Sequence, residues 1–166
     1  MLFRSAALVA ALADLVAALD LPPCHLVAQG FLGSVGIQYA LAHPDRVDRL
    51  AIINAPLSPA ARLPWKIRQM GIPLAGDMIT QDPLLVDRTL EGGGPYQIDD
   101  DDLDVYRRPF LKSSEVGRAL LATVQRLDLA TVSQAIAAGL QNWDHPTLLL
   151  DRKSTRLNSS HTVISY

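Results

Sequence analysis

Residues 25–50 constrain the fold of this chain more than any other stretch, because a strand, a tight turn and a helix follow one another directly. Residues 25–28, His-Leu-Val-Ala, form a short apolar run of the kind that fills a buried parallel strand. Gly30 and Gly33 follow within a few residues and allow the positive φ that a sharp reversal needs. The stretch therefore predicts a strand that turns abruptly into a helix.

A helix and a second strand are expected after this turn. Val35, Tyr39 and Ala42 recur at helical spacing and predict one apolar face. Pro44 ends the helix, since proline lacks an amide hydrogen and restricts the residue before it. Residues 49–53 form a second apolar run. A strand, a helix and a strand in this length predict one βαβ unit with a parallel strand pair.

Composition narrows the class of protein. The chain has 166 residues, 49% of them hydrophobic, and a formal charge of -2, which favours one globular domain over a disordered chain. Its positive charges are scattered, so we expect no nucleic-acid partner. No apolar run reaches the roughly 20 residues of a membrane span, so we expect no membrane partner. The single cysteine, Cys24, fits a reducing compartment and predicts a cytoplasmic location.

The stretch 25–50 resembles the nucleophile elbow and crossover helix of the α/β-hydrolase superfamily. In that family the nucleophile lies between small residues in a strand-to-helix turn, and the helix ends in a His-Pro-acid-Arg-Val run. Residues 43–47, His-Pro-Asp-Arg-Val, match this run without a gap. The same register places Ala28 and Leu32 at the flanking small positions and Gly30 at the nucleophile position. The resemblance predicts an α/β fold whose nucleophile is absent.

The resemblance also assigns roles around the turn. Gly30 has no side chain that could attack a carbonyl, an epoxide or a carbon–halogen bond. The backbone amide of Phe31 is expected to be one oxyanion-hole donor, and the Phe31 ring a substrate contact. Gln29 either contacts a ligand or satisfies the amides of the turn, and the sequence leaves both open. Ser34 half-matches a serine elbow, but it lies a full turn into the helix, and we interpret it as an ordinary helix residue.

The middle of the chain has a different character from its ends. We expect helices at 65–70, 83–90, 103–110, 115–127 and 131–140, separated by Gly71, Pro73, Gly76, the Gly-Gly-Gly-Pro run 92–95 and Pro109. A block of short helices between two core strands resembles the cap of the haloalkane dehalogenase and epoxide hydrolase branch. Residues 105–110, Val-Tyr-Arg-Arg-Pro-Phe, resemble a segment of dehalogenase caps. The fold class predicted is a partial α/β-hydrolase fold, with parallel strands and crossover helices, plus an inserted all-helical cap.

Aromatic residues in the cap are the candidate substrate contacts there. Trp65, Tyr96 and Tyr106 are expected to line an apolar pocket, and the alternative is that they form the core of the cap. The acidic run 99–104 lacks the alternating ligands and central glycine of a calcium loop, and it favours a helix start instead. We therefore expect no metal at this run, and the resemblance implies that the chemistry of the family uses neither a metal nor an organic cofactor.

We predict four segments. They are a partial hydrolase core at 1–56, a helical cap at 57–142, the next core strand at 143–150 and an artefactual tail at 151–166. The tail is interpreted as translated sequencing adapter, because its first codons can be written as the reverse complement of codons for residues 2–5. No acid or histidine of the family's catalytic set is recognisable, and His161 falls in the tail.

The functional hypothesis follows from the missing nucleophile. By resemblance, the family hydrolyses small apolar esters, halides or epoxides through a covalent intermediate. With glycine at position 30 this chain is expected to be catalytically incompetent. The alternative is a non-catalytic relative that binds a small hydrophobic ligand or a partner under its cap. The oligomeric state is not predicted.

Overall fold

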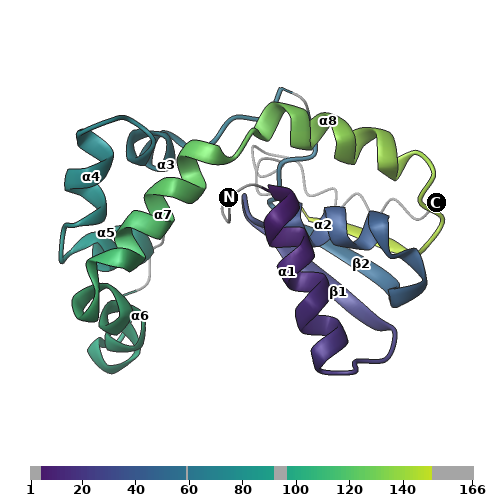
Figure 1. Cartoon of the computed structure of the whole chain (residues 1–166), viewed down its shortest axis with the longest axis horizontal. Helices are drawn as coiled ribbons and strands as arrows, with labels where there is room; N and C mark the ends of the chain where they lie inside the picture. The colour runs from purple at the N-terminus through teal and green to yellow at the C-terminus, as the bar shows by residue number, and fades with distance from the viewer. Residues whose placement is uncertain (1–4, 59, 92–96, 151–166) are drawn as a thin grey trace. The chain divides into compact units, whose positions relative to one another are not determined.

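The computed structural model describes residues 5–58, 60–91 and 97–150 and divides into two compact units (Figure 1). Unit 1 comprises Met1–Leu63 and Asp128–Tyr166, and unit 2 is Pro64–Leu127. The elements of unit 1 are α1 (Ser5–Ala18), β1 (Cys24–Gln29), α2 (Gly33–Ala42), the 3₁₀ helix η1 (Pro44–Arg46), β2 (Val47–Ile53), α8 (Leu129–Leu140) and β3 (Thr147–Leu150). Those of unit 2 are α3 (Trp65–Met70), α4 (Ala75–Thr80), α5 (Leu85–Leu90), α6 (Asp100–Lys112) and α7 (Ser114–Arg126).

Three parallel strands in the order β1-β2-β3 form the sheet of unit 1. The predicted βαβ unit is therefore confirmed, with α2 as the crossover between β1 and β2. The segment 143–150 supplies the third strand over its last four residues, Thr147–Leu150. Together with the largely helical middle of the chain, this arrangement agrees with the α/β class, the parallel strands and the helical insertion predicted from the sequence.

Helices α1, α2 and α8 pack on one face of this sheet (Figure 1). The core lies between them, where Ile37 of α2 and Ile136 of α8 are fully buried against Leu50 and Ile52 of β2. The buried face of α2 differs from the predicted stripe. Ile37 lies at its centre and Ala42 is exposed, because α2 turns the face bearing Ile37 toward the sheet.

The opposite face of the sheet is exposed among the described residues. Val27 of β1 has 63% of its surface accessible, and Leu148 and Leu150 of β3 are also exposed. The run at 25–28 was expected to be buried throughout, and that expectation was wrong. It alternates instead, since the helices of unit 1 cover one face and leave every second strand residue on the other.

Unit 2 is built around α7, which packs against α3, α4 and α6. The helix predicted at 65–70 coincides with α3. Two expected breaks are not breaks: Gly76 lies inside α4, and Pro109 lies inside the last turns of α6. Pro109 is tolerated because it falls late in the helix, where the carbonyl one turn earlier belongs to the exposed residue Val105.

The helical unit is shorter at both ends than the span 57–142 predicted for the cap. Helix α8 groups with unit 1, because it packs against α2 at Gly139, beside Leu41. The carboxylate of Asp128 caps α8 by accepting hydrogen bonds from the Thr131 amide at 3.2 Å and the Thr131 hydroxyl at 2.7 Å. These bonds lower the pKa of Asp128.

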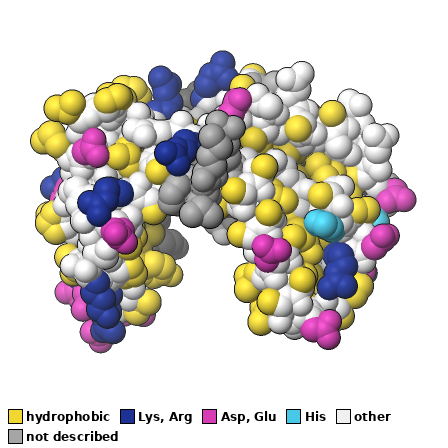
Figure 2. Space-filling view, viewed as in Figure 1, with side chains coloured by type: hydrophobic (Ala, Val, Ile, Leu, Met, Phe, Trp, Pro, Cys, Tyr) yellow, Lys and Arg dark blue, Asp and Glu magenta, His cyan; other side chains and the backbone are white. Residues whose placement is uncertain are grey.

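Charged side chains of both signs are interspersed on the face of the molecule shown in Figure 2. Within residues 5–58, 60–91 and 97–150, no group of acidic, histidine or cysteine side chains is placed to hold a metal ion. Asp99 is the N-cap residue of α6 and Asp100 lies in its first turn, so the acidic run begins a helix as expected. None of the helices described here has the length and apolarity required to cross a bilayer.

An ion-pair cluster centred on Arg107 ties α5 to α6 in unit 2. The Arg107 guanidinium pairs with the carboxylate of Asp87 on α5, and with Asp100 and Asp104 of its own helix at 3.1 Å each. Asp87 is the most enclosed acid of the three, with 16% of its side chain accessible against 88% for Asp100. The hydrogen bond from Arg107 lowers the pKa of Asp87, and the same contacts raise the pKa of Arg107.

Asp87→Asn should therefore destabilise unit 2 in a pH-dependent way. Because the pKa of folded Asp87 lies below its ordinary value of 3.8, ionised Asp87 stabilises the fold above that pH. The stabilisation is lost as the pH falls through the pKa of the folded state. Urea midpoints of wild type and variant should differ at pH 7 and converge in acid. Trp143→Phe as the common background leaves Trp65 as the reporter in unit 2.

Asp100→Asn is the matched control, since it removes an exposed partner of the same guanidinium. It should shift the midpoint much less than Asp87→Asn. Equal shifts for the two variants, or a shift for Asp87→Asn that does not change with pH, would contradict this account of the cluster.

Candidate active site at the carboxyl edge of the sheet

The carboxyl ends of the three strands lie at one edge of the sheet. Gln29 pairs in register with Ile53, and Ile53 pairs with Leu150, so β1, β2 and β3 all end at the same level. In open parallel sheets ligands bind outside the carboxyl ends of the strands. This edge is therefore the candidate functional site of unit 1.

The chain leaves β1 through a left-handed turn at Gly30. Gly30 has φ +68°, its N–H donates to the carbonyl of Ile53 at 3.0 Å, and its own carbonyl accepts from the Gly33 N–H at 3.1 Å. The first bond holds the turn to the end of β2, and the second closes it before α2 begins. A side chain at this φ is strained, and glycine is the residue that adopts it freely.

Gly33 allows the first turn of α2 to lie directly against the strand ends. A Cβ at residue 33 would stand 3.0 Å from the carbonyl carbon of Ala28 and 3.3 Å from Cβ of Ala55. Ala28 ends the buried part of β1, and Ala55 follows β2. The close packing of these small residues fixes how near the helix start comes to the edge.

The turn that precedes α2 presents a backbone donor at the edge. Phe31 directly follows Gly30 and is half-buried, and no described residue accepts a hydrogen bond from its N–H. The Ser34 hydroxyl is fully buried and donates to the Phe31 carbonyl at 2.8 Å. This hydrogen bond stabilises the turn, and it directs the Ser34 hydroxyl toward the backbone of the turn.

Space for a side chain remains open at residue 30. A Cβ built on Gly30 meets no atom within 4 Å. Gln29 beside it is exposed at the end of β1. The structure thus brings Gln29, Gly30 and Phe31 together at the edge, and the residue at the apex of the turn, Gly30, carries no side chain.

Asn54 is a further residue of this edge that the sequence did not single out. It follows β2 with φ +50°, and its N–H donates to the Leu150 carbonyl at 2.9 Å, which joins the ends of β2 and β3. Asn54 lines a hollow of about 440 Å³ together with the chain that follows it and the end of β3. Asparagine directly after an apolar run was the available signal, since asparagine is enriched at positive φ.

The cap residues proposed as substrate contacts lie on separate helices of unit 2. Trp65 begins α3 with 61% of its surface exposed, and the Arg68 guanidinium stands 5.6 Å from the centre of its ring. Tyr106 lies on α6 and is 58% exposed. Tyr96 lies outside the described residues. Their substrate-binding role stays a prediction.

Comparison with known proteins supports the class of fold that this edge and topology define. No protein-family model matches the sequence. Solved structures do match, and they define the fold as that of the α/β-hydrolases, with haloalkane dehalogenases as the similar proteins. The chain resembles AncHLD2, described as an ancestral haloalkane dehalogenase, with 25% identity and a TM-score of 0.75 over 91% of this chain and 58% of that one.

Two natural dehalogenases give similar results. Haloalkane dehalogenase DbeA from Bradyrhizobium elkani matches with 23% identity and a TM-score of 0.73, over 91% of this chain and 57% of its own. DatA from Agrobacterium tumefaciens matches with 22% identity and a TM-score of 0.68, over 83% of this chain and 52% of its own. The chain therefore spans somewhat more than half the length of these proteins.

Gly33→Ala should disturb this edge measurably. Its added methyl group would press on the backbone of Ala28, so we expect a loss of about 1–3 kcal/mol of unfolding free energy. Gly36→Ala is the matched control, because Gly36 lies about one turn after Gly33 in the same helix. A Cβ there stands 3.5 Å and 3.7 Å from side-chain atoms, so the change should be neutral or stabilise by up to about 1 kcal/mol.

Chemical denaturation of both variants tests this difference. Equal stability of Gly33→Ala and Gly36→Ala would show that α2 does not approach the strand ends as closely as described.

Proposed function

We propose that this chain is a haloalkane dehalogenase-like α/β-hydrolase domain that binds small apolar organic molecules but does not form the covalent intermediate of its family. The observation that carries the proposal is Gly30, a left-handed glycine at the apex of the turn between β1 and α2. Backbone hydrogen bonds hold this turn at the end of the strands, and the space for a side chain at residue 30 is open. Glycine supplies no side chain that could act as a nucleophile there.

The rest of the edge supports recognition of a polarised small molecule. The Phe31 amide lies just before the N-cap of a ten-residue helix, near the end at which backbone N–H groups and the helix dipole favour partial negative charge. Apolar residues around the hollow beside Asn54 favour an uncharged organic body. The similarity to dehalogenases suggests esters, halides or epoxides as the class of molecule bound.

Halide and nitrophenol release tests the second half of the proposal, that the chain forms no covalent intermediate. The purified chain should release no halide from a panel of bromoalkanes, and no nitrophenol from short nitrophenyl esters, above the rate without protein. A turnover that follows protein concentration and persists through repeated purification would overturn the proposal.

Gly30→Asp tests whether the nucleophile is what the turn lacks. The left-handed backbone should make the variant less stable by about 1–2 kcal/mol. Its carboxylate oxygen should attack the carbon that bears bromine in a bromoalkane, forming a C–O bond while the C–Br electron pair leaves with bromide. We expect a mass increase of one alkyl group on the protein, detected by mass spectrometry after digestion as an ester on residue 30.

Gly30→Asn is the matched control, since it has the same backbone strain and shape without a carboxylate. It should acquire no alkyl group. Modification of Gly30→Asn or of the wild type to the same extent would mean that the alkyl group is carried elsewhere. A stable Gly30→Asp protein without an adduct would contradict the idea that the turn lacks only its nucleophile.

A further inference from the structure

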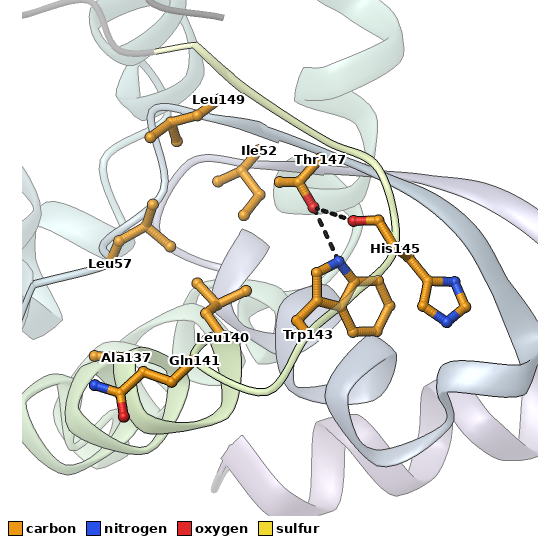
Figure 3. Close-up of a pocket in the computed structure, with 9 residues that line it drawn as sticks. All are labelled: Ile52, Leu57, Ala137, Leu140, Gln141, Trp143, His145, Thr147 and Leu149. Atoms are coloured by element: carbon orange, nitrogen blue, oxygen red, sulfur yellow. Dashed lines mark hydrogen bonds between the residues drawn. The ribbon is translucent and has the colours of Figure 1, made fainter. Parts of the chain in front are cut away.

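A second hollow lies in unit 1, under α8 and on the helix-covered side of the sheet (Figure 3). Its volume is about 550 Å³, within the range of about 300–1,000 Å³ that is typical of small-molecule sites. Strands β2 and β3, the second half of α8 and the connection from α8 to β3 form its walls. The lining residues are Ile52, Leu57, Ala137, Leu140, Gln141, Trp143, His145, Thr147 and Leu149.

One wall of this hollow is aromatic, and its indole N–H is already hydrogen-bonded within the wall. The rings of Trp143 and His145 stack with centroids 4.6 Å apart at an angle of 28°. Trp143 Nε1 donates to the Thr147 hydroxyl at 2.9 Å, and that hydroxyl donates to the His145 carbonyl at 3.2 Å (Figure 3). Because the indole N–H is satisfied, this wall offers a ligand mainly its aromatic surface.

The remaining walls are aliphatic and uncharged. Ile52, Leu57, Leu140 and Leu149 surround the side opposite the rings in Figure 3. None of the nine lining residues is Asp, Glu, Lys or Arg, and Nε2 of the lining residue His145 already lies 3.4 Å from the carboxylate of Asp144. A charged ligand would therefore leave water without an ionic partner of its own here. The exposed Gln141 supplies the one side-chain amide among the lining residues.

This hollow is distinct from the turn at Gly30. Neither Gly30 nor Phe31 lines it, whereas Leu57 and Leu149 line both this hollow and the one beside Asn54. The two hollows are therefore neighbours that share an aliphatic wall. A molecule held beside Trp143 would lie on the helix-covered face of the sheet, away from the turn.

We propose that the hollow lined by Trp143 is a second small-molecule site, and that it takes an uncharged aromatic compound. The aromatic wall provides stacking, the aliphatic walls provide apolar burial, and the lack of Asp, Glu, Lys and Arg among the lining residues selects against charge. This site needs no nucleophile, so its existence does not depend on the function proposed for the turn.

A pair of fluorescent probes tests the chemistry of the ligand. N-phenyl-1-naphthylamine is uncharged, and 8-anilinonaphthalene-1-sulfonate has the same ring system with a sulfonate added. In the full chain with Trp65→Phe, Trp143 is the remaining tryptophan and reports binding by energy transfer to the probe. We expect saturable one-to-one binding of the uncharged probe, at least tenfold tighter than that of the sulfonate.

Two neighbouring alanines of α8 locate the site. Ala137 lines the hollow, whereas Ala138 is exposed on the same helix. Ala137→Phe fills the space and should weaken binding of the uncharged probe at least tenfold, while Ala138→Phe should leave it unchanged. Equal affinity of the two variants, or equal affinity of the two probes for the parent chain, would overturn the proposal.

A measurement on the parent chain locates the probe independently, so the proposal can still be tested if the Ala137→Phe variant misfolds. Contacts between the bound uncharged probe and methyl groups should appear as nuclear Overhauser effects to Ile52 and Leu140. Effects to Phe31 with none to Ile52 or Leu140 would place the probe at the turn and contradict a second site.

Discussion

The close approach of α2 to the ends of β1 and β2 is the constraint on which the rest of unit 1 depends. It is possible because Gly33 has no Cβ to press on Ala28 and Ala55. The same approach requires the chain to reverse within a few residues, and Gly30 makes that reversal with a left-handed backbone. The parallel register of the three strands then places their carboxyl ends together, and the candidate site is built at that edge.

Local patterns in the sequence were sufficient to predict the parallel strands, the crossover helix and α3. These predictions succeeded because the turn glycines and apolar spacing act over short distances. The exposure of Val27 could not be predicted, since it depends on which face of the sheet the helices cover. Helix α4 was missed because Gly76 reads as a helix breaker, whereas it is buried between packed elements inside the helix.

The candidate site was predictable in part for the same reason. Gln29, Gly30 and Phe31 are consecutive, so their convergence follows from the turn itself. Asn54 reaches the edge through strand register, which links residues distant in sequence. The hollow beside Trp143 depends on how α8 lies against β2 and β3, and neither its volume nor its aromatic wall could be read from spacing. In the function proposed here, fold and function separate at Gly30, where the turn keeps its left-handed backbone and has no side chain to act as a nucleophile.

The most direct test of the central claim is the backbone geometry of Gly30 in solution. Nuclear magnetic resonance can measure the scalar coupling across the hydrogen bond from the Gly30 N–H to the Ile53 carbonyl, and can determine the φ angle of Gly30. The account predicts a detectable coupling, since these atoms lie 3.0 Å apart, and a φ near the +68° of the structure. A missing coupling together with a negative φ would mean that the turn is not an elbow, and the function proposed for it would fail.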